Sequence, residues 1–181
     1  MKAYFLILLF VCVPLFATAQ TPLSADAVMT EAYAVAKKEN KKVFVMFHAS
    51  WCGWCHKMDA AMNEPAMKKF FDDNFVIRHL VVLEAGGKKN LENPGGAELM
   101  KKYYGDKSGI PYWLVFDVNG NLLADSKLRA EGGGPDTGNN VGCPAREDEV
   151  AYFIDVLKKT TKLKEADLTL IAQRFRKNAT N

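Results

Sequence analysis

The sequence lacks the features that define several large classes of protein. It has only four cysteines in 181 residues, too few for a small domain held together by disulfides. Lysine and arginine never form a run longer than two, and the formal net charge is only +3, so no nucleic-acid partner is expected. No internal repeat or low-complexity block is present. The composition, 49% hydrophobic and 25% charged, is that of a globular chain of about one domain.

The longest apolar run lies at the N-terminus. Lys2 precedes an apolar segment over residues 3–16, and Ala17-Thr18-Ala19 is a small-residue cleavage site. This pattern predicts a signal peptide over residues 1–19, because a transmembrane helix needs about 18 to 20 apolar residues. A retained N-terminal anchor is the alternative. We therefore expect an exported protein, periplasmic or secreted, with no stable membrane insertion after cleavage. Its mature chain would be residues 20–181.

Apolar periodicity predicts an α/β domain in the mature chain. The expected helices cover 24–40, a stretch after Cys52 interrupted near Pro65, 97–104, 147–159 and 165–177. The expected strands cover 43–49, 75–83, 112–116 and 121–126, with the last two forming a hairpin. Segment 84–96 is expected to be a loop, and 127–145, rich in glycine, to be irregular and an insertion. The last helix, within a C-terminal extension over 164–178, has one apolar face that we expect to pack on the protein itself.

One short segment carries chemistry. Cys52 and Cys55 form a Cys-x-x-Cys motif that follows a predicted buried strand and opens a predicted helix. The unpaired N–H groups at a helix N-terminus favour a thiolate, so Cys52 is the expected nucleophile. Cys55, one turn further, is placed to attack the resulting mixed disulfide and release the product.

The same residues fit three other sites. Cys52, Cys55 and His56 have the spacing of covalent haem attachment, although such proteins are largely helical. Adding Cys143 gives a zinc ligand set, which lacks a second closely spaced pair. The third alternative is an inert structural disulfide, which would not explain why Trp51 and Trp54 flank the cysteines. We expect neither a metal nor another cofactor.

A proline lies where a second part of the site is expected. Pro111 follows Gly109-Ile110 and directly precedes the strand at 112–116, and a proline is best accommodated at the first residue of a strand. The Ile110–Pro111 bond could be cis at a modest intrinsic cost.

Together these features resemble the thioredoxin superfamily over residues 24–159. The resemblance rests on residues 47–55 (Phe-His-Ala-Ser-Trp-Cys-Gly-Trp-Cys) and on Gly109-Ile110-Pro111. It implies a thioredoxin-like fold: a central mixed sheet with a terminal β-hairpin, flanking helices and here an extra C-terminal helix. It also implies attack by Cys52, resolution by Cys55 and a cis Pro111 facing the disulfide. The substrate-binding residues expected from it are Trp51, Gly53, Trp54, Ile110 and Pro111.

The resemblance is closest to exported thioredoxin-like proteins and interchange-protein domains, and two positions depart from cytosolic thioredoxin. Trp54 replaces a proline between the cysteines, and Met46 stands where a buried aspartate would accept the proton of the resolving thiol. Glu64, His56 or water could take that proton.

Two further residues are candidate auxiliary groups. His56 could tune a thiolate, and Cys143 is expected at the rim of the site, because the loop at 127–145 starts from the catalytic end of the sheet. The predicted function is an exported thiol–disulfide oxidoreductase, acting as a reductase on protein substrates and exchanging electrons with a redox partner protein. The alternatives are an oxidase or isomerase of the same fold, and a non-catalytic binding module.

Overall fold

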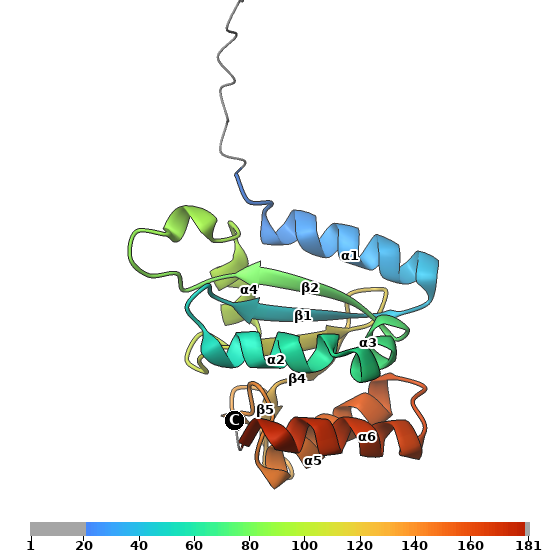
Figure 1. Cartoon of the computed structure of the whole chain (residues 1–181). Coiled ribbons are helices and arrows are strands. Elements are labelled where there is room, and N and C mark those ends of the chain that lie inside the picture. The colour runs from blue at the N-terminus through green and yellow to red at the C-terminus, as the bar shows by residue number, and fades with distance from the viewer. Residues whose placement is uncertain (1–20, 180–181) are drawn as a thin grey trace, which may run out of the picture.

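A four-stranded mixed sheet forms the centre of the protein (Figure 1). The computed structural model describes residues 21–179, so the predicted signal peptide at 1–19 lies outside the described residues. The strand order is β2-β1-β3-β4. β1 pairs parallel with β2 and antiparallel with β3, and β4 is antiparallel to β3. The strands are β1 (Lys42–His48), β2 (Phe75–Val81), β3 (Tyr112–Phe116) and β4 (Leu122–Asp125).

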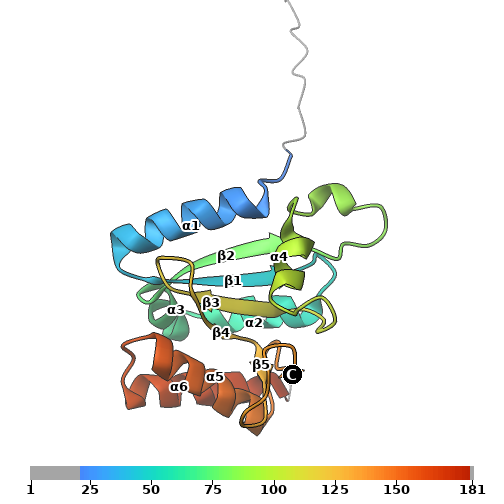
Figure 2. The same ribbon diagram turned by 180° about the vertical axis from the view of Figure 1, so that it is seen from behind.

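Helices cover both faces of this sheet, and each face has its own hydrophobic core (Figures 1 and 2). One face packs against α1 and α4, and the other packs against α2, α3, α5 and α6. The helices are α1 (Ala25–Glu39), α2 (Gly53–Asn63), α3 (Pro65–Asp72), α4 (Gly96–Lys102), α5 (Glu147–Thr160) and α6 (Glu165–Arg176). The predicted α/β fold with a mixed sheet and a terminal hairpin is confirmed.

Local sequence signals account for the element ends. Ser24 caps α1 by accepting a hydrogen bond from the Ala27 N–H at 3.2 Å, and Asn40 ends this helix in the left-handed conformation. Pro65 is the first residue of α3, where its missing N–H costs nothing. The interior residues of β1 are all buried, as expected of a central strand covered on both faces.

Three segments differ from expectation. β2 ends at Val81, two residues early, because Leu83 adopts a left-handed conformation (φ 56°) that cannot continue a strand. The loop at 84–96 contains a 3₁₀ turn, η1 (Lys89–Leu91). The segment at 127–145 is not irregular throughout, since β5 (Lys127–Leu128) pairs with β6 (Asn139–Asn140). Such two-residue strands carry no periodicity from which they could be predicted.

A partly buried ion pair fixes the start of this segment. The Arg129 guanidinium donates to both carboxylate oxygens of Asp125, at 2.8 and 2.6 Å, and also to the carbonyls of Gly134 and Pro135. A bidentate pair of this kind holds its two residues in one orientation. The segment is thereby fastened to the end of β4, on the side where β3 begins.

The C-terminal helix packs on the protein itself, as predicted. Leu168, Ile171 and Phe175 of α6 are buried in the core shared with α3 and α5. After α6, a final 3₁₀ turn, η2 (Lys177–Ala179), returns the chain toward the segment at 127–145. Among residues 21–179, no helix is long and apolar enough to span a membrane.

Candidate active site

The end of β1 delivers the two cysteines to the start of α2. The chain leaves β1 at His48, and the Cys52 N–H donates to the Ala49 carbonyl at 3.0 Å. Cys52 is the N-cap of α2, and its sulfur accepts a hydrogen bond from the Cys55 N–H at 3.2 Å. The same donor would stabilise a Cys52 thiolate in the reduced protein.

Cys52 and Cys55 form a disulfide with an S–S distance of 2.01 Å. Cys52 is 3% exposed and Cys55 is completely buried. Of the two sulfurs, that of Cys52 therefore lies nearer the surface, and that of Cys55 lies behind it. This order agrees with a first thiol that meets the substrate and a second that acts from within.

The proline expected beside the disulfide is there. The Ile110–Pro111 peptide bond is cis, and the Ile110 carbonyl oxygen lies 3.6 Å from Cys52 Sγ. Asn140 holds this turn: its side-chain amide donates to the Ser108 and Pro111 carbonyls, each at 3.0 Å. Asn140 was not identified from the sequence, because the contact joins residues about 30 positions apart through a segment without a pattern.

Two tryptophans flank the disulfide and are held at the surface. Trp51 and Trp54 are both exposed. The Trp51 indole N–H donates to the Leu83 carbonyl at 2.8 Å, and Lys57 Nζ lies 4.5 Å from the Trp54 ring centroid. Exposed and oriented aromatic rings are typical of surfaces that bind other molecules.

A buried carboxylate braces the segment before the cysteines. Glu84 accepts from the Ser50 N–H at 2.6 Å and from the Ser50 hydroxyl at 2.8 Å. The Ser50 N–H is the main reason that the pKa of Glu84 lies below its usual range, since hydrogen bonds to the charged form stabilise it. The pairing spans 34 residues, so nothing in the local sequence indicated it.

We expect Glu84→Gln to destabilise the protein at neutral pH. A carboxyl whose pKa is depressed by folding adds stability above its unfolded pKa, about 4.3, and this stability is lost as pH falls through the lower folded pKa. The difference in free energy of unfolding between wild type and variant should therefore shrink at acidic pH, as measured by urea unfolding. Glu98→Gln, at an exposed position of α4, is the control. If Glu84→Gln lowered the free energy of unfolding by the same amount at pH 7 and at pH 3, this role would be contradicted.

Met46 is buried at the position of the missing aspartate, in the central strand between β2 and β3. Of the proposed replacements, Glu64 is unsuitable. It lies nine residues after Cys55, about 14 Å along α2, and forms an ion pair with Arg174 of α6. A carboxylate closer to Cys55 is Asp59, one helical turn beyond it on α2.

Asp59 belongs to a polar cluster under α2 that the sequence analysis did not identify. Its carboxylate lies 2.7 Å from His79 Nε2, and the His79 ring is 5.1 Å from the His48 ring, centroid to centroid. Burial, followed by the nearby His79, lowers the pKa of His48. The register explains the cluster, because His79 is the β2 partner of Met46, two residues before His48.

His56 contacts the backbone rather than a sulfur. Its Nε2 lies 3.0 Å from the Ser50 carbonyl oxygen, an arrangement in which the ring N–H donates. Its backbone N–H donates to the Cys52 carbonyl at 3.2 Å, but among the described residues no hydrogen bond joins the His56 ring to either sulfur. The structure thus gives His56 a position that braces the segment before Cys52.

The segment around Cys143 lies beside the site, but the thiol itself faces inward. Gly142 accepts from the Trp113 indole N–H at 2.9 Å, and the Cys143 sulfur accepts from the Asn178 amide at 3.3 Å. Cys143 is buried, and burial raises the pKa of its thiol to about 12. Cys143 thus lies beside the proline turn, in the segment expected at the rim, but its thiol is buried against Asn178 of η2 rather than exposed.

A pocket of about 460 Å³ opens between Trp54, the proline turn and this segment. It is lined by Trp54 of α2, by Ile110 and Pro111, and by residues 140–143. The loop that was expected at the rim of the site thus supplies a wall of it.

The described residues hold no group of three or more histidine, cysteine, aspartate or glutamate side chains that could bind a metal ion. Cys52 and Cys55 are bonded to each other, and Cys143 is held by Asn178. The candidate zinc ligands Cys52, Cys55, His56 and Cys143 thus do not converge.

Comparison with known proteins identifies the family. A family model described as thioredoxin-like matches residues 25–117, just over half of the chain. A search of curated proteins finds no match.

Several solved structures are similar to this chain. A disulphide isomerase from Xylella fastidiosa Temecula1 is 22% identical, with 62% of this chain and 80% of that one covered and a TM-score of 0.46. A DsbH oxidoreductase is 23% identical, with 84% and 92% covered and a TM-score of 0.44. The C-terminal domain of Neisseria meningitidis DsbD in the oxidised form is 22% identical, with 59% and 84% covered and a TM-score of 0.42.

The family match and the site agree with each other. The matched region contains β1, the Cys52–Cys55 disulfide, and the cis Pro111 with the strand β3 that follows it. A reversible disulfide at a helix N-terminus in this fold exchanges with other disulfides. The chain belongs to the thioredoxin-like family, and its fold and Cys-x-x-Cys pair make it a thiol–disulfide oxidoreductase.

Proposed function

We propose that this protein is exported and reduces disulfides in polypeptide substrates through Cys52 and Cys55. The observation that carries the proposal is the position of Cys52: it caps α2, accepts the Cys55 N–H, and lies 3.6 Å from the Ile110 carbonyl. A substrate segment that passes over Ile110 and Pro111, between the two exposed tryptophans, would bring its sulfur to Cys52. Export rests on the sequence of residues 1–19.

The reaction consists of two exchanges. The Cys52 thiolate attacks one sulfur of the substrate disulfide, whose S–S bond breaks, and the other substrate sulfur leaves as a thiolate that takes up a proton. Cys55, after losing its proton, then attacks Cys52 Sγ and releases the second substrate thiol. The substrate gains two electrons and the protein is left with the Cys52–Cys55 disulfide, which a redox partner protein must reduce again.

Uncharged residues between the cysteines favour the reducing direction. A strongly oxidising pair needs a highly stabilised thiolate. Here Gly53 and Trp54 bring no charge to Cys52, and His56 is engaged by Ser50. The helix N-terminus and the Cys55 N–H are then the groups that stabilise the Cys52 thiolate, so the reduced form gains only modest stabilisation.

The equilibrium potential of the Cys52–Cys55 pair tests this direction. We expect a value nearer to about −270 mV than to about −120 mV, the values typical of a reducing and an oxidising member of this class. Redox titration against glutathione or dithiothreitol, followed by tryptophan fluorescence, measures it. A value near −120 mV would instead assign an oxidase.

A further inference from the structure

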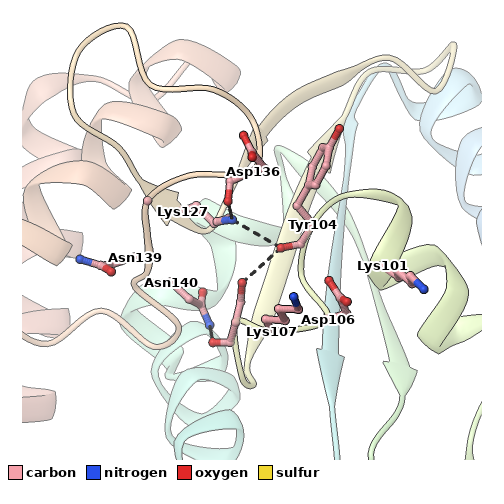
Figure 3. A pocket seen from close by; sticks show the side chains of 10 residues that line it. Lys101, Tyr104, Asp106, Lys107, Lys127, Asp136, Asn139 and Asn140 are labelled. Carbon is pink, nitrogen blue, oxygen red and sulfur yellow. Dashed lines mark hydrogen bonds between the residues drawn. The ribbon is translucent and has the colours of Figure 1, made fainter.

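A second pocket lies behind the proline turn. It has a volume of about 740 Å³ and lies between the turn after α4 and the β5–β6 pair (Figure 3). Three lysines line it, Lys101, Lys107 and Lys127, together with Asp106 and Asp136. Nothing in the proposed exchange between Cys52 and Cys55 uses it.

Lys127 is the unusual member of this pocket. It is only 4% exposed, and its ammonium donates to two backbone carbonyls, Asp136 at 2.9 Å and Tyr104 at 3.4 Å. Asp136 offers this carbonyl while its carboxylate points away from the ammonium (Figure 3). Within residues 21–179, no carboxylate forms an ion pair with Lys127.

Neither the hydrogen bonding nor the charge of the Lys127 ammonium is fully matched by its neighbours. It has three donors, of which two are used, and a buried positive charge without an opposite charge is unfavourable. Lys107, exposed on the rim, adds positive charge on the same side of the pocket. A carboxylate that enters the pocket would supply both the missing acceptor and the missing charge.

The pocket adjoins the pocket lined by Trp54, Ile110 and Pro111. Ser108 and Asn140 line both, and the Asn140 amide donates to the Ser108 and Pro111 carbonyls, which tie the two together. The segment from Ser108 to Pro111 spans at most about 10 Å, because an extended chain advances about 3.3 Å per residue. A polypeptide that follows this segment from Pro111, beside Cys52, therefore covers it in roughly three residues, so the acidic side chain is sought roughly two to four residues from the substrate cysteine.

We propose that this pocket selects substrates by binding an acidic side chain close to the substrate cysteine. The carboxylate accepts a hydrogen bond from Lys127 and is attracted by Lys107, while the substrate cysteine meets Cys52. The inference rests on the proposed function and adds the class of substrate: disulfide-bonded polypeptides with aspartate or glutamate near the cysteine.

Matched peptides test this selection. Each peptide carries one cysteine as a mixed disulfide with glutathione, and one glutamate or glutamine placed roughly two to four residues away on either side. The rate constant for reduction by the reduced protein is measured for each. We expect the best glutamate peptide to react about tenfold faster than its glutamine counterpart, and added salt to narrow the difference.

Three lysine variants complete the test. Lys127→Met and, at the exposed rim, Lys107→Gln should reduce the preference for glutamate, whereas Lys102→Gln, on α4 but outside this pocket, should keep it. Equal rates for the glutamate and glutamine peptides at every position would overturn the proposal. So would a preference that survives in folded Lys107→Gln. Failure of the proposed function is distinguishable, because then no peptide is reduced faster than by the Cys52→Ser protein.

Discussion

Replacing Cys52 with serine is expected to abolish disulfide reduction. A serine hydroxyl is not ionised at neutral pH and cannot form a disulfide, so both exchanges are lost. We expect the rate of insulin reduction with dithiothreitol as donor to fall to the uncatalysed level, a loss on the order of 10³-fold or more. Because Cys52 lies at the surface end of the disulfide and caps α2, no other described thiol is placed to replace it.

Two further variants separate the roles of the cysteines. Cys55→Ser should still attack the substrate but fail to release it, so that a mixed disulfide between Cys52 and the substrate accumulates and is found by mass spectrometry. Cys143→Ser is the matched control. Its thiol is buried with a pKa raised to about 12, so its loss should leave turnover unchanged. Wild-type turnover in Cys52→Ser, or its loss in Cys143→Ser, would refute this assignment.

The parts of the fold that sequence could predict are those with local signals. Ser24, the apolar run of β1 and Pro65 each mark an element by their own chemistry, and the observed elements begin or end within about two residues of the expected ends. The Cys52–Cys55 pair and the proline before β3 were found for the same reason. Their closeness in space followed only from the family resemblance.

The supporting residues could not be predicted, because each depends on a contact between distant segments. Glu84 accepts a hydrogen bond from Ser50, 34 residues away, and Asn140 donates one to Ser108, 32 residues away. Asp59 and His79 meet because α2 packs over β1 and β2, which no spacing in the sequence encodes. The inward direction of Cys143 likewise depends on η2, at the far end of the chain.

The second large expected effect concerns α6, which completes the core below the site. Phe175 is completely buried, and its ring lies 4.9 Å from that of Phe153 and 6.3 Å from that of Phe71, centroid to centroid. Phe175→Ala removes this ring and leaves a cavity between α3, α5 and α6. We expect the free energy of unfolding to fall by about 3–5 kcal/mol in urea titrations, the usual cost of deleting a buried phenylalanine.

Leu170→Ala is the control for this prediction, because Leu170 lies on the opposite side of α6 and is 49% exposed. Its substitution should change stability by only about 0.5 kcal/mol or less.

The effect of Phe175→Ala should also reach the site, because the chain after Phe175 holds residues beside the pocket. Arg176 donates to the Ala145 carbonyl at 2.7 Å, and Asn178 donates to the Pro144 carbonyl at 3.1 Å. Loosening α6 should therefore raise the KM for polypeptide substrates while the small reductant dithiothreitol still reduces the disulfide. If Phe175→Ala were no more destabilising than Leu170→Ala, α6 would be an appendage rather than part of the core.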